Sequence, residues 1–148
     1  MTPKARKTLL ITLSTLLTVI PIGGHLIARH NAFKFGTTML GAFATVGHEG
    51  FADTAELRKL FDHPQIAPYI RTVDRLSILN GDHDERIRDL QAGLIYYSEQ
   101  ASVPQPQRFT TPPHLKHFQI DTTDPSDDGL VKASANLILT YLKRFRPL

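Results

Sequence analysis

The sequence predicts an all-α protein in which an N-terminal membrane helix leads into a small helical domain. An uncharged apolar stretch fills residues 9–27, close to the length of about twenty residues that a helix needs to cross a bilayer. Beyond residue 52, apolar residues recur every three or four positions, as they do on amphipathic helices. Asparagine, glycine and proline separate these segments where helices are expected to end.

The apolar stretch has the composition of a membrane anchor. Three basic side chains precede it within residues 1–7, and Arg29 and Lys34 follow it. The positive-inside rule then keeps the N-terminus in the cytoplasm and places the rest of the chain in the periplasm, with the anchor in the inner membrane. The residues expected to face lipid are Leu9, Leu10, Ile11, Leu13, Leu16, Leu17, Val19, Ile20 and Ile22.

A cleaved signal peptide is the main alternative to a retained anchor, and it would make the protein secreted. The strongest apolar run, residues 9–22, has the length of a signal-peptide core, and Gly23 and Gly24 weaken the helix after it. No suitable cleavage site follows closely, because Leu26 stands two places before Ala28. We therefore expect a retained anchor. A mitochondrial presequence and a buried helix of a soluble fold are the remaining alternatives.

Three regions follow from this reading: an anchor at residues 1–30, an apolar connector rich in glycine and threonine at residues 31–52, and a soluble helical domain at residues 53–148. The apolar stretch within the connector, residues 35–47, is too short to span a bilayer, and we expect it to form a weak helix that covers the core. Residues 1–48 carry five basic and no acidic side chains, whereas residues 49–148 carry twelve basic and fourteen acidic ones. We expect no nucleic-acid partner, because the domain itself has no excess of positive charge.

Local signals divide the domain into helices. The first is expected to begin at an Asp53 cap and to end before Pro64. The second begins at Pro68 and ends at Asn80 and Gly81, a strong stop signal. The connection to the third helix is short, so the two should form an antiparallel hairpin.

The third helix is expected to begin at a cap formed by Asp82 or Asp84. Its apolar stripe consists of Ile87, Leu90, Leu94, Tyr97 and Ala101. The last helix has Asp124 as its expected cap and Pro125 in its first turn. Its stripe consists of Leu130, Val131, Ser134, Leu137, Ile138, Tyr141, Leu142 and Phe145. Such a stripe must be buried, either on the hairpin of the same chain or on a partner.

A proline-rich segment at residues 103–123 separates these two helices. We expect an extended surface loop that binds a partner, with a short strand at residues 117–120. The partner-binding residues predicted from the loop and the last helix are Pro104, Pro106, Arg108, Phe109, Pro112, Pro113, Tyr141 and Phe145.

Groups that could carry catalysis or bind a metal are few. His48 and Glu49 match the start of the zinc-protease pattern HExxH, but the fifth position is Ala52, so one ligand is missing. We interpret this segment as a polar turn between two helices. His114 and His117 are spaced to share a face, but beside two prolines we expect exposed loop residues. The chain has no cysteine, and we expect no metal or cofactor.

The acidic cluster of residues 82–85 is the other candidate for chemistry. It comprises Asp82, His83, Asp84 and Glu85. Metal-dependent phosphohydrolases use a His-Asp pair inside an apolar helix, whereas this pair lies in a polar turn. Capping of the following helix accounts for the acids without a metal.

These observations favour a non-catalytic role. The leading hypothesis is a membrane-anchored periplasmic accessory or assembly subunit of a membrane-associated complex, such as a respiratory or envelope-enzyme complex. The first alternative is a small envelope hydrolase that uses Glu49 or the acidic cluster of residues 82–85. The second is an inhibitor or immunity-type protein that binds an enzyme through the proline-rich loop.

Overall fold

The chain folds into helices throughout the part that the structure describes. The computed structural model describes residues 3–146, except for the side chains of residues 46–52. Its elements are α1 (Pro3–Ala52), α2 (Thr54–Phe61), α3 (Ala67–Arg75), α4 (His83–Ala101), the short 3-10 helix η1 (Gln105–Gln107) and α5 (Asp127–Arg144). The predicted all-α class is confirmed. The short strand expected at residues 117–120 is wrong, because these residues form an irregular loop with no strand partner among the described residues.

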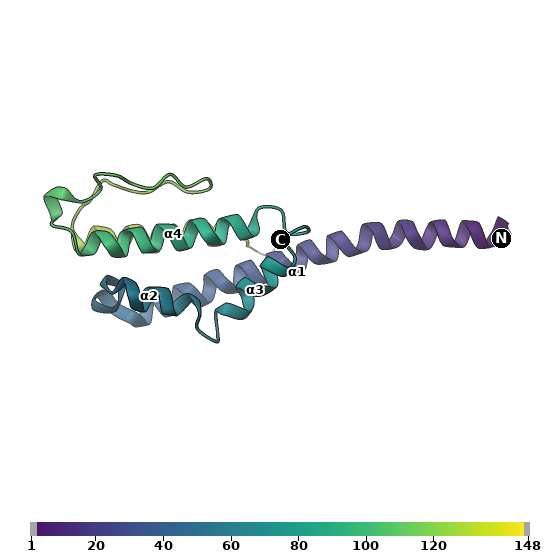
Figure 1. Cartoon of the computed structure of the whole chain (residues 1–148), viewed down its shortest axis with the longest axis horizontal. Helices are drawn as coiled ribbons and strands as arrows, with labels where there is room; N and C mark the ends of the chain where they lie inside the picture. The colour runs from purple at the N-terminus through teal and green to yellow at the C-terminus, as the bar shows by residue number, and fades with distance from the viewer. Residues whose placement is uncertain (1–2, 147–148) are drawn as a thin grey trace.

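Helix α1 is one continuous helix of 50 residues that joins the predicted anchor to the predicted connector. Its first part, residues 3–23, projects from the bundle as a bare stalk (Figure 1). Its second part lies inside the bundle, where Ala28, Ala32, Phe35 and Met39 are fully buried at spacings of three and four residues. The connector is therefore a core helix of the bundle, and no break in the fold occurs at residue 30.

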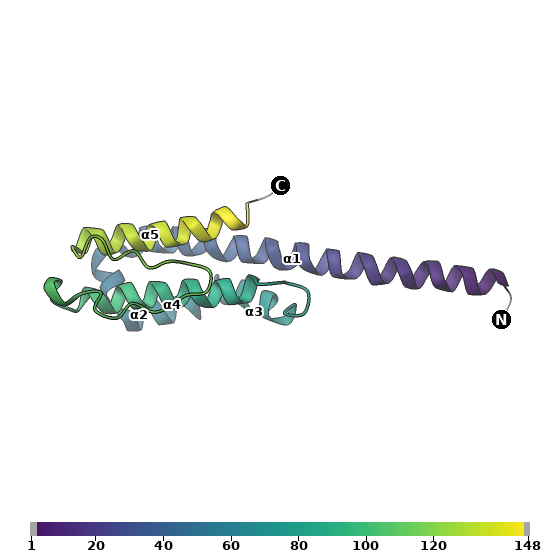
Figure 2. The ribbon, with the colours of Figure 1, turned by 90° about the horizontal axis from the view of Figure 1, so that it is seen from above.

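The bundle has a stalk end and a far end. The stalk end is where α1 leaves the bundle, next to the start of α4 and the end of α5 (Figure 2). The far end is where α1 ends and α2 begins (Figure 1). Helix α4 runs from the stalk end to the far end, and α5 runs back beside it and beside α1 (Figure 2).

Helices α1, α4 and α5 enclose the main core. The predicted stripe of α5 is buried against α1 and α4 of the same chain, including Leu130, Leu137, Ile138 and Tyr141. A hydrogen bond from the Tyr141 hydroxyl to the Ala32 carbonyl, 2.8 Å long, joins α5 to α1 inside this core. The last helix therefore needs no partner protein to cover its apolar face.

The caps confirm some of the predicted helix starts and correct others. The Asp53 carboxylate caps α2 by accepting from the backbone N–H groups of residues 55 and 56. Helix α5 is capped by Ser126, whose hydroxyl accepts from Gly129 N at 3.0 Å, so the predicted Asp124 cap is wrong. Asp124 instead accepts from Ser126 N in the preceding turn. Asp82 occupies the cap position of α4 but makes no capping bond.

Helix α3 ends earlier than its apolar pattern predicts. It stops at Arg75, and a turn of residues 76–82 connects it to α4. The buried Asn80 side chain donates to the Val73 carbonyl at 2.8 Å and so satisfies a carbonyl at the end of the helix. Gly81 has a φ of +67°, which favours glycine in this turn.

Candidate functional site

The stalk carries all nine side chains that the sequence predicts to face lipid. Each of them is about half to two-thirds exposed, from Leu16 at 48% to Leu17 at 68%. The helix from Pro3 to Thr45 is long and apolar enough to cross a membrane or to act as a signal sequence, and only 6% of its most apolar window is buried. The helix of a soluble core would be mostly buried, so that alternative does not fit this structure.

At the stalk end, the turn after α3 packs closely against α1 at Gly24, a position that has no side chain. A Cβ atom at Gly24 would lie 2.5 Å from Leu79 Cδ1 and 3.2 Å from its Cβ, so any larger residue would force the Leu79 side chain to move. One residue earlier, a Cβ atom at Gly23 would touch nothing. Next to Leu79, Ile78 points into open space and is 95% exposed. The sequence analysis did not single out Ile78, and its position outside the helical stripe was the available signal.

Three rings contact one another at the same end of the bundle. The His25 ring of α1 lies 4.8 Å from the ring of His83 in a tilted arrangement, and the Phe145 ring lies 5.0 Å from His83, edge to face. His83 is 1% exposed, and its Nδ1 atom has no hydrogen-bond partner within the described structure. Burial, together with the nearby His25, lowers the pKa of His83 to about 4. His83 is therefore a neutral core residue at pH 7.

Ion pairs occupy the acidic cluster of residues 82–85. Arg86 Nε donates to Asp82 Oδ2 at 2.8 Å, and this bond lowers the pKa of the Asp82 carboxyl. Lys116 Nζ lies 2.6 Å from Glu85 Oε2 and lowers the pKa of Glu85 in the same way. A general acid needs a raised pKa at neutral pH, so both shifts run against that role. Ion pairing, and not the predicted capping, accounts for Asp82.

We expected His114 and His117 to be exposed in the loop, but the acidic cluster of residues 82–85 holds His117. The His117 side chain is 11% exposed, and its Nε2 lies 3.1 Å from Glu85 Oε2. The backbone N–H of His117 also donates to Asp89 Oδ2 at 2.8 Å. His114 is exposed, as predicted. Glu85 therefore fixes the tip of the loop to α4, and the two histidines have different surroundings.

Arg108 joins the two ends of the proline-rich loop. Its guanidinium donates to the carbonyls of residues 101, 103 and 125, at 3.2, 2.8 and 2.6 Å. It also lies 2.7 Å from Asp127 Oδ1, and its side chain is only 5% exposed. The next residue, Phe109, has a φ of 64° and lies partly buried beside Tyr96 and Tyr97. Both residues hold the loop in place.

The remaining predicted contact residues divide into exposed and buried groups. Pro104, Pro106 and Pro112 are exposed, and Pro113 is half-buried. Tyr141 and Phe145 are buried in the chain's own core, at 0% and 1% exposure. They offer no surface to a partner in this fold, so only the prolines remain as candidate contact residues.

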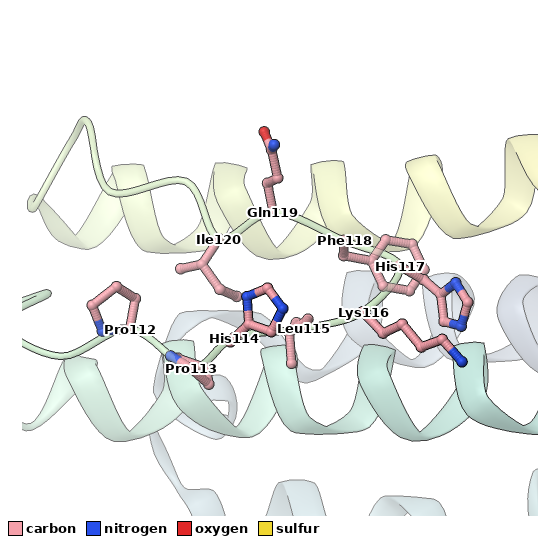
Figure 3. Close-up of a pocket in the computed structure, with 9 residues that line it drawn as sticks. All are labelled: Pro112, Pro113, His114, Leu115, Lys116, His117, Phe118, Gln119 and Ile120. Carbon is pink, nitrogen blue, oxygen red and sulfur yellow. The ribbon is translucent and has the colours of Figure 1, made fainter.

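An open groove of about 620 Å³ lies between the two arms of the loop, and residues 112–120 of this one segment line it. The loop turns back over α4 and α5, and Gln119 points away from the bundle (Figure 3). Leu115 and Phe118 of the segment are buried against the bundle. The groove is the inner side of this turn and contains no paired carboxylates.

The second acidic candidate, Glu49, belongs to the residues whose side chains the structure does not describe, as does His48. Their backbone is helical up to Ala52, so the polar turn expected at this point is wrong. This last turn of α1 lies at the far end, whereas α4 begins at the stalk end (Figure 1), with Asp82 at its cap position and Glu85 in its first turn. The two acidic candidates therefore do not form one site. Among the described residues, no group of three or more potential ligands could hold a metal ion.

Comparison of the chain with protein-family models, with curated proteins and with solved structures finds no match.

Proposed function

We propose that this protein is a non-catalytic, membrane-anchored accessory subunit, which holds its helical bundle at a fixed height above the periplasmic face of the inner membrane for a partner protein. One observation carries the proposal: α1 is a single helix whose first part is bare and apolar and whose second part is the core of the bundle. A flexible linker would let the bundle tumble, whereas this helix transmits its orientation directly to the bundle.

The dimensions of α1 fit this role. Residues 9–27 extend over about 27 Å at 1.5 Å per residue, which matches the hydrocarbon core of a bilayer at about 30 Å. Residues 28–52 continue the helix for a further 36 Å or so. The far end of the bundle, with Pro104 and Pro106 on the adjoining loop, would therefore stand roughly 35–40 Å above the membrane core. Anchoring also raises the effective concentration for a partner in the same membrane.

The ion-paired acids and the separation of the two acidic candidates support a binding role over a hydrolytic one. Asp82 and Glu85 have lowered pKa values and basic partners. The loop is a fitting contact element, because Arg108 and Glu85 hold its backbone in one shape. A preorganised loop loses less conformational entropy on binding than a flexible one.

The proposal is tested by copurification of the full-length protein from detergent-solubilised membranes. We expect a stoichiometric partner to be recovered with the wild-type protein and to be lost with Pro106→Arg, which adds a charge to an exposed loop position. Thr140→Arg, on the exposed side of α5, is the matched control and should retain the partner. Recovery of the wild-type protein alone would overturn the accessory-subunit proposal.

The absence of cysteine from the chain allows the orientation to be tested directly. Single cysteines are introduced at Ala5 and at Gln105, and intact cells permeable only at the outer membrane are treated with a membrane-impermeant maleimide. We expect labelling at Gln105→Cys and none at Ala5→Cys. The reverse labelling pattern would contradict the proposed topology.

A further inference from the structure

We propose that the stalk end of the bundle rests on the bilayer that α1 crosses, with Ile78 inserted among the lipids and a rim of basic side chains bound to anionic phosphate headgroups. This inference rests on the proposed function, because it requires α1 to be held in a membrane. It adds a second, peripheral contact between the protein and the bilayer. Three observations carry it: the level of the turn on α1, the exposure of Ile78 and the distribution of charge.

The position of the turn along α1 sets its depth. If residues 9–27 fill the hydrocarbon core, the outer border of that core lies close to Ile27. The turn of residues 76–82 contacts α1 at Gly24, through Leu79. Gly24 is three residues before Ile27, which is about 4–5 Å toward the centre of the bilayer. The turn therefore lies at the boundary between acyl chains and headgroups, the zone in which peripheral apolar side chains insert.

Ile78 is the side chain best placed to enter this zone. It is 95% exposed, far more than any other large apolar side chain described outside α1, of which Leu139 at 44% is the next. Its turn is ordered by the Asn80 hydrogen bond to Val73 and by the contact of Leu79 with Gly24. An isoleucine that is held rigidly in water gains favourable burial when lipid covers it. Contact with the bilayer therefore explains why the Ile78 side chain is exposed in the structure.

The charges at the stalk end match an anionic surface. The basic side chains there are Arg29, Arg75, Lys143, Arg144 and Arg146, and the ion pairs found in residues 3–146 include none of them. Most of the acidic charge nearby is offset, because Asp82 pairs with Arg86, and Asp74 and Asp84 share Arg88. The domain as a whole carries slightly more acidic than basic residues, so this rim is a local concentration of positive charge. Headgroup phosphates are its natural counterions.

Folding creates this rim from separate parts of the chain. Arg75 closes α3, and Lys143 and Arg144 lie in the last turn of α5. The backbone carbonyl of Arg146 accepts a hydrogen bond of 2.7 Å from the Arg29 guanidinium, which ties the end of α5 to α1. The sequence flank of the anchor, which sets orientation during insertion, contains only Arg29 and Lys34. The rim can therefore act on lipid only after the bundle has folded.

The test measures the depth of Ile78 in the full-length protein. The protein is placed in nanodiscs of phosphatidylglycerol and phosphatidylcholine that contain doxyl-labelled lipid, and a single NBD fluorophore is attached at Ile78→Cys. We expect doxyl lipid to quench this fluorophore, as it should quench one at Leu17→Cys in the stalk. A fluorophore at Gln105→Cys, at the far end, should not be quenched.

The outcomes separate the two proposals. Quenching at Leu17→Cys without quenching at Ile78→Cys would overturn the bilayer contact and leave the anchor in place. The absence of quenching at both positions would overturn the anchor and the contact together. Quenching at both, with none at Gln105→Cys, supports both proposals.

A second arm tests the basic rim. Arg75→Gln, Arg144→Gln and Arg146→Gln are combined in the protein labelled at residue 78, and Lys132→Gln at the far end of α5 is the matched control. Because α1 is continuous from the stalk into the bundle, the turn can leave the bilayer surface only when α1 changes its tilt. Each basic side chain removed should shift the balance between the two tilts by about five-fold, so the triple variant should lose most of its quenching in anionic nanodiscs. The wild-type protein should lose it in nanodiscs of phosphatidylcholine alone. Unchanged quenching in both cases would overturn the role of the headgroup phosphates.

Discussion

The contact between α1 and α5 depends on the absence of a side chain at Gly36. A Cβ atom at this position would lie 2.7 Å from Tyr141 Cε1 and 2.8 Å from its Cδ1, which is closer than van der Waals contact. The ring cannot easily move away, because it is fully buried and its hydroxyl donates to the Ala32 carbonyl. We expect Gly36→Ala to destabilise the bundle by about 1–3 kcal/mol through overpacking. A gain of about 0.5–1 kcal/mol in helix propensity offsets part of this loss.

The same substitution at Gly41 is the matched control. A Cβ atom there would have nothing within 4 Å, so only helix propensity acts, and we expect Gly41→Ala to stabilise the bundle by about 0.5–1 kcal/mol. The assay is thermal unfolding of the full-length protein in detergent, followed by the near-ultraviolet circular dichroism of the buried tyrosines Tyr96, Tyr97 and Tyr141. The midpoint should rise for Gly41→Ala and fall for Gly36→Ala. Equal shifts would refute the packing described for α1 and α5.

Three further predictions concern single residues. The pKa of His83 is lowered to about 4, so folding favours the neutral form of this histidine. The corresponding stability, about 3 kcal/mol in the free energy of unfolding, is fully present above pH 6.5 and is lost as the pH falls toward 4. His83→Leu should therefore flatten the decline of the denaturant midpoint in this window, and an unchanged decline would count against the buried neutral histidine. Arg108→Lys loses the planar donor set that holds the loop and should destabilise the protein by about 1.5–3 kcal/mol, with faster chymotryptic cleavage at Phe109; digestion at the wild-type rate would argue against this role. Tyr141→Phe removes the hydrogen bond to the Ala32 carbonyl and should lower the free energy of unfolding by about 1 kcal/mol. Tyr69→Phe is the control, because the structure shows no side-chain hydrogen bond for Tyr69, and it should leave the unfolding midpoint unchanged. Equal effects of the two substitutions would contradict the hydrogen bond between α5 and α1.

The features that could be predicted from sequence are those that local chemistry decides. The apolar stalk follows from composition, and the stripe of α5 follows from a spacing of three and four residues. The Asp53 cap of α2 was predictable because a cap involves only neighbouring residues in the chain. For the same reason the Gly81 turn between α3 and α4 was recognised, although α3 ends four residues before Leu79, the last apolar residue assigned to it.

The features that could not be predicted depend on contacts between distant residues. Gly23 and Gly24 suggested a weakened helix, yet α1 continues through both, and at Gly24 it packs closely against Leu79 of the distant turn after α3. Asp82 is an exception, because its partner Arg86 is only four residues away, and this i,i+4 pair was a local signal that the sequence analysis missed. The order of the proline-rich loop depends on Arg108, whose carbonyl partners lie up to 17 residues away. No local pattern identifies such partners.

The central claim is that one rigid helix both crosses the membrane and forms the core of the bundle. It is tested most directly by pulsed electron paramagnetic resonance on the full-length protein in nanodiscs, with spin labels at Leu17→Cys in the stalk and Gly41→Cys in the bundle. A continuous helix places these positions about 36 Å apart, so we predict a single narrow distance distribution near that value. A broad or much shorter distribution would show that α1 bends or breaks between the membrane and the bundle. Loss of the Leu17 label from the mature protein would show that the stalk is cleaved, and either result would contradict the account.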